Sequence, residues 1–168
     1  MKWKWTWDDI YKRVYEHKAD LMNLIAATLQ TQRAMIFDKE GAYNGREKWK
    51  PSQRALKKGG MTLSKSGALR RSIAPRNNGI VPGKDRGTII MIEGTKVSIG
   101  TTLAYAAIHN YGGTIKHPGT RNGFGRGIRI RPHNIVIPKR PFLDYTSEDK
   151  KEVVDTLMNA MAALIDGD

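Results

Sequence analysis

Histidine is the residue type in this sequence that is best suited to acid–base or metal chemistry, because the chain of 168 residues contains no cysteine. The absence of cysteine excludes disulfides, thiolate zinc sites and cysteine nucleophiles. The four histidines are His17, His109, His117 and His133. No two of them are four residues apart, the helical spacing at which a histidine pair binds zinc. The sequence therefore predicts no metal site.

A nuclease is the enzyme class that the basic middle of the chain suggests, with His109 or His133 as a general base. The carboxylates available there to hold a metal are Asp85, Glu93 and Asp144. None of them is spaced to act together with either histidine. The glycine-rich segment 123–127 does not lie between a strand and a helix, as a phosphate-binding loop does. We therefore expect no catalytic residue and no cofactor, and a hydrogen-bonded structural role for His109.

The net charge of +13 is concentrated in the middle of the chain. Residues 1–50 contain 10 Lys/Arg and 7 Asp/Glu, residues 51–145 contain 17 and 3, and residues 146–168 contain 2 and 6. A basic middle binds either nucleic acid or an acidic protein surface, including the acidic end of a second copy. The sequence has neither the apolar stretch of a membrane helix nor that of a signal peptide, so we expect a protein made in the cytosol without a membrane partner.

The N-terminal part predicts an aromatic arm followed by one long helix. Three tryptophans in residues 1–7 alternate with polar residues, which would place their indoles on one side of an extended arm. Thr6 and Asp9 have the spacing of a capping box. No glycine or proline interrupts residues 8–36, whose apolar side chains fall within one broad helical stripe.

Two polar segments that contain several glycines, residues 37–60 and 116–134, are expected to be flexible loops. Trp49 would act as an apolar pin that fixes the first of them to the domain. Residues 75–86 are rich in proline, glycine and asparagine and are predicted to form an exposed loop.

A short helix is predicted before that exposed loop, with Ser64 or Ser66 as its N-cap. Leu69 and Ile73 give it an apolar pair at the i, i+4 spacing. Its arginines, Arg70 and Arg71, would then face solvent or a partner.

The centre of the sequence predicts a strand, a turn and a short helix in one continuous unit. Residues 88–92 and 96–100 would pair as a hairpin around Gly94. The helix that follows would place Leu103, Ala106, Ala107 and Asn110 on one face. Gly112 or Gly113 would end it in a left-handed conformation.

The C-terminal part predicts a second hairpin, in which Ile128–Arg131 pairs with Ile135–Ile137, and a last helix capped by Thr146 and Asp149. The complete pattern predicts a single α+β domain over residues 1–168. It would consist of a long N-terminal helix, a small, mainly antiparallel sheet built from hairpins, short helices and a C-terminal helix.

Four segments, in this order, resemble the phage virion-morphogenesis proteins, the tail-completion group of Mu-like and P2-like phages. They are Trp49 with Pro51, residues 63–73, residues 97–101 with 105–113, and residues 137–143. The resemblance assigns structural roles to Trp49, Gly67, Leu69, Gly100, Tyr105, His109, Gly112, Gly113, Pro141 and Phe142. Asn110 stands where the family pattern has glutamine.

The resemblance implies a structural protein without catalytic residues, which completes the tail at its head-proximal end or helps to join head and tail. It would form a homo-oligomeric ring at the tail–neck junction and contact other tail, neck or connector proteins. Its location would be the host cytoplasm during assembly and then the virion. The residues expected to make contacts are basic: Arg70, Arg71, Arg126, Arg129, Arg131, Lys139 and Arg140. The alternative is a nucleic-acid-binding protein that uses the basic central region, so DNA contact is possible but not required.

Overall fold

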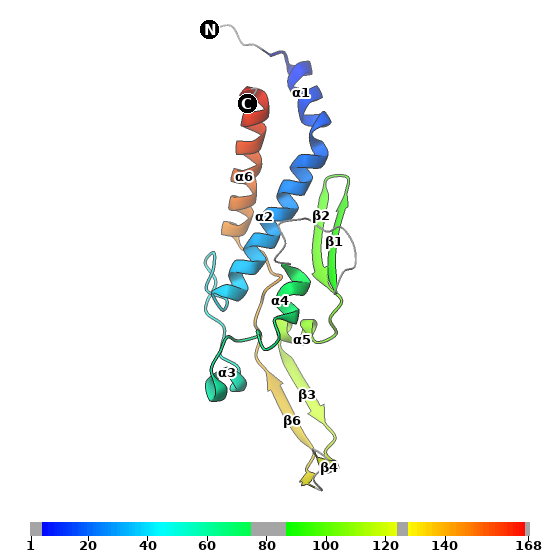
Figure 1. Ribbon diagram of the computed structural model, residues 1–168, viewed down its shortest axis with the longest axis vertical. Helices are drawn as coiled ribbons and strands as arrows, with labels where there is room; N and C mark the ends of the chain where they lie inside the picture. The colour runs from blue at the N-terminus through cyan, green and yellow to red at the C-terminus, as the bar shows by residue number, and fades with distance from the viewer. Residues whose placement is uncertain (1–4, 75–86, 124–127, 167–168) are drawn as a thin grey trace.

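The computed structural model describes residues 5–74, 87–123 and 128–166, and it is elongated, with helices at one end and a β-ribbon at the other (Figure 1). The helices are α1 (Trp7–Glu16), α2 (Lys18–Asp38), α3 (Gln53–Lys58), α4 (Ala68–Ile73), α5 (Ala106–Tyr111) and α6 (Ser147–Asp166). The strands are β1 (Thr88–Glu93), β2 (Lys96–Thr101), β3 (Gly113–His117), β4 (Thr120–Gly123), β5 (Ile128–Ile130) and β6 (His133–Ile137). All observed pairing is antiparallel, in the three pairs β1–β2, β3–β6 and β4–β5. The predicted α+β class is confirmed.

The predicted N-terminal helix is present, but it is interrupted at His17, which separates α1 from α2. The backbone angles of His17, φ −94° and ψ 12°, depart from helical values, and its ring Nδ1 lies 3.3 Å from Asp20 Oδ2. The capping box is confirmed, because the side chains of Thr6 and Asp9 each accept a hydrogen bond from the backbone N–H of the other. The predicted aromatic arm is wrong at Trp7, which lies in the helix and is 85% exposed.

The first predicted hairpin is confirmed and the second is wrong. β1 and β2 pair with Glu93 opposite Lys96, around Gly94 at φ +60°. Residues 128–131 do not pair with 135–137, because β6 pairs with β3 and β5 pairs with β4. Gly113 lies opposite Ile137 and His117 opposite His133, so the two strand pairs form one nested ribbon that extends away from the helices (Figure 1).

The segments expected to be flexible loops therefore contain regular structure. Residues 37–60 include α3, and residues 116–134 include β4 and β5. Their flexibility in solution remains a prediction. The predicted exposed loop 75–86 lies outside the described residues.

The core lies where α2, α4 and α5 meet the loop around Trp49 and the segment that precedes α6. Its central ring is Phe37, which contacts the rings of Trp49 and Phe142, each at a centroid distance of 5.4 Å. Trp49 Nε1 donates a hydrogen bond of 3.2 Å to the Pro141 carbonyl. Trp49 is only 4% exposed, which confirms that it pins this loop to the core.

A buried carboxylate joins α6 to α2. Asp149, which also forms the predicted cap of α6 with Thr146, is fully buried. Its Oδ2 accepts a hydrogen bond of 2.8 Å from Arg33 on α2 and another from Arg46, and its Oδ1 accepts one of 2.9 Å from Asn44. Burial alone raises the pKa of Asp149, but the hydrogen bonds from Arg46 and Asn44 and the charge of Arg33 outweigh it and lower the pKa to about 2.

The end of α5 lies against the backbone that follows β6. Gly112 has φ +74° with an extended ψ of 176°, so it ends the helix at positive φ but not in the predicted left-handed helical conformation. A Cβ atom at this position would lie 2.8 Å from the backbone nitrogen of Lys139. The backbone angle and the close approach both require glycine here.

We predict that Gly112→Ala lowers the free energy of unfolding by about 2 kcal/mol or more, because it combines a strained φ with a backbone clash. The matched control is Gly59→Ala at the end of α3. Gly59 has nearly the same backbone angles, φ 71° and ψ −177°, but no atom lies within 4 Å of its Cβ position. Denaturant unfolding of both variants measures the difference. Equal losses would mean that the approach of Lys139 contributes nothing.

We also predict that Asp149→Asn lowers the free energy of unfolding at neutral pH by about 3–5 kcal/mol, because it leaves two arginines without their buried counter-ion. The folded-state pKa of Asp149 lies below its ordinary value of 3.8, so its contribution is present above pH 4 and is lost as the pH falls toward 2. Thermal unfolding from pH 2 to 7 should show this loss in the parent and a weaker dependence in the variant. Asp155→Asn, at an exposed position of α6, is the control and should leave the curve unchanged.

Candidate interaction surfaces

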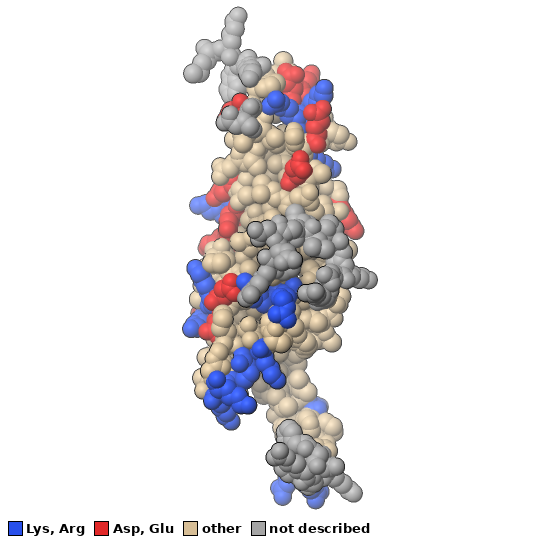
Figure 2. Space-filling model, in the orientation of Figure 1, with Lys and Arg blue, Asp and Glu red and all other residues tan. Residues whose placement is uncertain are grey.

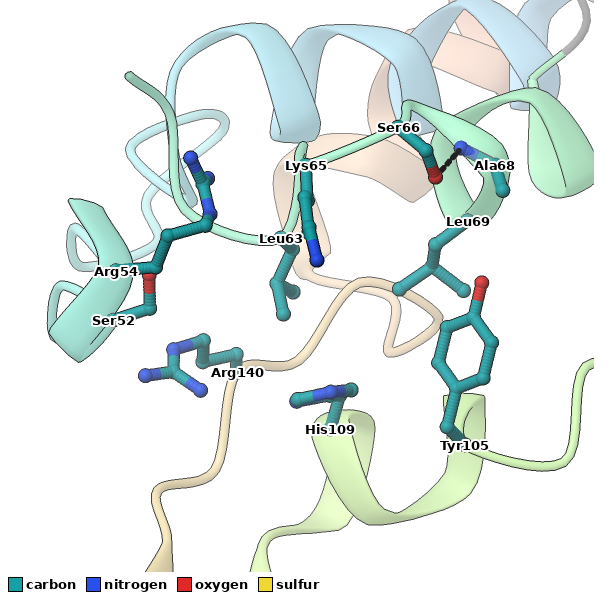
Figure 3. A pocket seen from close by; sticks show the side chains of 10 residues that line it. All are labelled: Ser52, Arg54, Leu63, Lys65, Ser66, Ala68, Leu69, Tyr105, His109 and Arg140. Carbon is teal, nitrogen blue, oxygen red and sulfur yellow. Dashed lines mark hydrogen bonds between the residues drawn. The ribbon is translucent and has the colours of Figure 1, made fainter. Parts of the chain in front are cut away.

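Three of the segments that carry the family resemblance meet at one pocket of about 330 Å³ (Figure 3). Its lining comes from α3 and the loop before it, the loop that leads into α4, the start of α4, α5, and the segment after β6. The lining residues are Ser52, Arg54, Leu63, Lys65, Ser66, Ala68, Leu69, Tyr105, His109 and Arg140. Residues of these three segments therefore line one site in the fold, in addition to the packing roles that they have separately.

The pocket has basic side chains and no carboxylate among its lining residues. Arg140 donates through Nε to the Lys50 carbonyl at 2.9 Å, and Arg54 donates to the carbonyls of Gly59 and Met61. Both guanidinium groups thus hold the protein's own backbone. Lys65 has no hydrogen bond or ion pair with another described residue, and its side chain points into the pocket (Figure 3).

His109 lies on the wall of this pocket, with its ring next to Tyr105 at a centroid distance of 6.2 Å. Burial, together with the nearby charge of Arg140, lowers the pKa of His109, so the ring is neutral at pH 7. The His109 carbonyl accepts a backbone hydrogen bond from Arg140 at 2.9 Å, but Nδ1 of the ring is buried without a described partner. The hydrogen bond expected for a structural His109 is thus made by its backbone carbonyl and not by Nδ1 of its ring.

Asn110 has a structural role in this region that the sequence analysis did not predict, although it placed this residue on a helix face and at a position where the family pattern has glutamine. Its side chain is fully buried, and Oδ1 accepts hydrogen bonds from the backbone nitrogens of Phe142, at 2.9 Å, and Leu143, at 3.1 Å. One side chain of α5 thus fixes the segment after β6. The feature of the sequence that could have indicated this role is a polar residue on the otherwise apolar face of a short helix.

Several of the basic residues expected to make contacts are used inside the molecule. Arg70 was expected to face solvent or a partner, and its guanidinium forms two hydrogen bonds to Asp38 on α2, at 2.9 and 2.8 Å, within the same chain. Arg140 is 4% exposed and holds a backbone carbonyl, so it is a buried structural residue. Lys139 Nζ lies 3.4 Å from Asp144 Oδ2 and is otherwise exposed.

Of the four other expected contact residues, three have the predicted exposure and one lies outside the described residues. Arg71 is exposed on α4, Arg129 is exposed on β5, and Arg131 is exposed directly after it. Arg126 lies outside the described residues. Figure 2 shows Lys and Arg mostly over the lower half and the tip of the molecule, and Asp and Glu mostly over the upper part.

The ribbon itself has an apolar surface. Ile115 of β3 and Ile135 of β6 are cross-strand partners and are 42% and 37% exposed, and Val136 is 73% exposed. His117 and His133 also lie opposite each other, with their rings stacked at a centroid distance of 4.9 Å. Strand pairing between segments distant in sequence brings these histidines together, so the spacing of histidines along the chain gave no sign of it. A ribbon with apolar side chains and cations exposed on it has the composition of a protein contact site.

The remaining motif residues are structural. Gly67, at φ +70°, is the N-cap of α4 in place of the predicted serines, and the side chain of Ser66 only accepts a bond of 3.4 Å from Ala68. Leu69 is buried in the core, and Gly100 pairs with Ile89 in the first hairpin. Gly113, at φ +155°, begins β3.

Neither a metal site nor a membrane span is found in the described part of the chain. No group of three or more potential metal ligands comes together within residues 5–74, 87–123 and 128–166. None of the helices in these ranges has the length and hydropathy needed to cross a bilayer.

The sequence profile of the phage virion morphogenesis family matches residues 6–162. The chain is also similar to "Mu-like prophage FluMu G protein 2" of Haemophilus influenzae, with 28% identity over 149 residues. That alignment covers 89% of this chain and 82% of the Haemophilus protein. No solved structure matches the chain.

We predict that Asn110→Ala lowers the free energy of unfolding by about 1–3 kcal/mol, because it removes the acceptor of two backbone N–H groups. Denaturant unfolding measures the loss. Asn159→Ala, at an exposed position of α6, is the control and should change stability by less than about 0.5 kcal/mol. A neutral Asn110→Ala variant would mean that water satisfies both N–H groups.

Proposed function

The chain belongs to the phage virion morphogenesis family, and from that premise we propose that it completes the tail or joins head and tail as a homo-oligomeric ring at the tail–neck junction. As a structural protein of virion assembly it would have other tail, neck or connector proteins as neighbours. It would assemble in the host cytoplasm and remain in the virion.

The observation that carries this proposal is the projecting ribbon formed by β3, β4, β5 and β6 (Figure 1). Every residue of β3 and β6 is exposed except His117 and Ile137, which are half-buried. A two-stranded ribbon is marginal in water without a surface to pack on, so a partner that covers it would stabilise it. A subunit whose ribbon is stabilised by contact with a neighbour is suited to a position where two assemblies join.

The charge distribution supports an asymmetric contact between subunits. The cations lie mostly toward the ribbon end and the carboxylates mostly toward the helical end (Figure 2). Unlike ends favour a head-to-tail arrangement, which closes into a ring when the rotation between subunits permits it.

Locating the protein in the particle tests this proposal most directly. Imaging of particles at intermediate resolution should place a ring of this chain where tail and neck meet. Particles of the same phage that lack the gene should have unfinished or unjoined tails. A position along the tail tube or inside the head would contradict the proposal.

A nucleic-acid-binding protein is the second candidate, because Arg129 and Arg131 are exposed near the tip of the ribbon and lack a carboxylate partner among the described residues. Binding to phosphates would weaken steeply with salt, as a straight line in a log–log plot. Assembly through apolar contacts would persist at moderate salt.

We predict that the double charge reversal Arg129→Glu with Arg131→Glu leaves thermal unfolding nearly unchanged, because both side chains are exposed. Assembly should fail, since acidic groups would then face a surface matched to arginine, and like charges at an interface are strongly unfavourable. Complementation of a gene deletion measures this loss. The control is Lys57→Glu with Lys58→Glu, which changes the net charge equally on α3.

The purified parent protein should not bind DNA tightly at near-physiological salt. Tight binding with a steep salt slope would favour the second candidate. Normal particles from the folded ribbon variant would show that these two arginines contact no partner.

A further inference from the structure

Arg140 is a buried cation without a carboxylate partner in the described part of the chain. Only 4% of the residue is exposed, and its single side-chain hydrogen bond runs from Nε to the Lys50 carbonyl. The buried Arg33, by contrast, is paired with Asp149 at 2.8 Å. Because a buried charge is costly without a counter-ion, Arg140 lacks a partner that its burial calls for.

The pKa values of the two buried arginines reflect this difference. Burial lowers the pKa of Arg33, and the charge of Asp149 raises it again in part. Burial also lowers the pKa of Arg140, but no charge from a described carboxylate acts against that effect. An anion beside Arg140 would offset the cost of burial, as Asp149 does for Arg33.

The unbonded atoms of Arg140 belong to the pocket between α3, α4 and α5. Arg140 lines this pocket, and its Nη1 and Nη2 atoms form no hydrogen bond with a described residue and are not closed off from solvent. Lys65 enters the same pocket from the loop that leads into α4 (Figure 3). It is exposed and has no ion pair with a described residue. Since no carboxylate is found among the lining residues, two cations face the pocket without a counter-ion.

This set of donors fits a carboxylate. A guanidinium binds a carboxylate through two parallel N–H···O bonds, and an ammonium group nearby adds a second favourable charge. The pocket volume of about 330 Å³ is sufficient for one acidic side chain. A phosphate of a DNA backbone is joined to a sugar on both sides, so it cannot enter such a pocket as the end of a side chain can.

We propose that this pocket binds a carboxylate from an acidic segment of a neighbouring virion protein, with Arg140 and Lys65 as its two cations. The choice of a virion protein as the neighbour rests on the proposed function, whereas the carboxylate site rests on the pocket alone. Arg54 is not one of the binding cations, because its guanidinium already donates to the carbonyls of Gly59 and Met61.

NMR spectroscopy of the histidine rings tests the site. His109 lines the pocket, whereas His17, His117 and His133 do not. The probe is a capped tripeptide with one glutamate between two glycines, and the matched neutral probe has glutamine in its place. At constant pH and ionic strength, the glutamate peptide should shift the ring signals of His109 and leave those of the other three histidines unchanged. The glutamine peptide should shift none of them.

Two variants measure what each cation contributes. Arg140→Lys keeps the charge but loses the planar pair of donors, and it is expected to weaken binding of the glutamate peptide about tenfold. Lys65→Gln removes an exposed charge and is expected to weaken binding about threefold. Lys57→Gln, on α3 and outside the pocket lining, is the control and should bind as the parent does. Thermal unfolding shows whether each variant is folded, and Lys65→Gln decides the test if Arg140→Lys does not fold.

Three outcomes of these titrations would overturn the proposal: no saturable shift of His109 with the glutamate peptide, equal shifts with the glutamine peptide, or unchanged binding by the folded variants. Inorganic phosphate is titrated in the same way. Tighter binding of phosphate than of the glutamate peptide would also overturn the proposal, because the pocket would then be a phosphate site.

Complementation of a gene deletion separates this inference from the proposed function. Lys65→Glu places a carboxylate in the pocket and should lower the yield of infectious particles, whereas Lys57→Glu should not. A normal yield with Lys65→Glu would show that no virion protein uses the pocket, while the assembly function would stand. If the peptide binds as expected but imaging places the protein away from the tail–neck junction, the carboxylate site is supported and the proposed function is wrong.

Discussion

The buried ion pair between Arg33 and Asp149 is the constraint on which the helical end of the protein depends. Its two members come from α2 and from the first turn of α6, 116 residues apart in the sequence. Both side chains are almost completely buried, so each charge relies on the other and on the polar groups around them. Arg46 and Asn44 complete the shell of the carboxylate, which also ties the loop after α2 to the same point.

The same arginine extends this constraint to the segment that follows the ribbon. Arg33 Nη1 donates to the carbonyls of Phe142, at 3.3 Å, and Asp144, at 2.7 Å. From the opposite side, Asn110 accepts from the backbone nitrogens of Phe142 and Leu143. Residues 142–144 are thus held between α2 and α5, and Phe142 is kept in the aromatic core beside Phe37. This arrangement also determines the shape of the pocket. Its lining residues His109 and Arg140 lie on α5 and on the segment after β6, which the Asn110 hydrogen bonds hold together.

Local signals in the sequence predicted local structure correctly. The Gly94 turn placed the first hairpin, Thr6 and Thr146 placed the starts of two helices, and Trp49 was correctly expected to hold its loop on the core. The nested ribbon was missed because Gly113–His117 has no simple alternation and its partner strand lies about twenty residues later, beyond a glycine-rich segment. Pairing over such a distance depends on the whole ribbon and not on a turn. Arg33 had a readable signal, since it lies on the buried face of α2 between Leu29 and Phe37, where a charge requires a counter-ion.

The large net positive charge of the chain has to be divided into cations that are paired within the molecule and cations that are free. Arg33, Arg46, Arg70 and Arg140 are bound to carboxylates or carbonyls of the same chain, so they contribute to the total charge but are already paired within the molecule, Arg140 through Nε alone. Arg129 and Arg131 remain exposed near the tip of the ribbon, and Lys65 remains free in the pocket. Lys65 shares the pocket lining with the aliphatic side chains of Leu63 and Leu69, and the ribbon that carries Arg129 and Arg131 also exposes Ile115 and Val136 on β3 and β6. Phosphate backbones provide charge without an apolar surface, whereas acidic protein surfaces provide both. The mixed chemistry of the free cations therefore favours protein partners over nucleic acid.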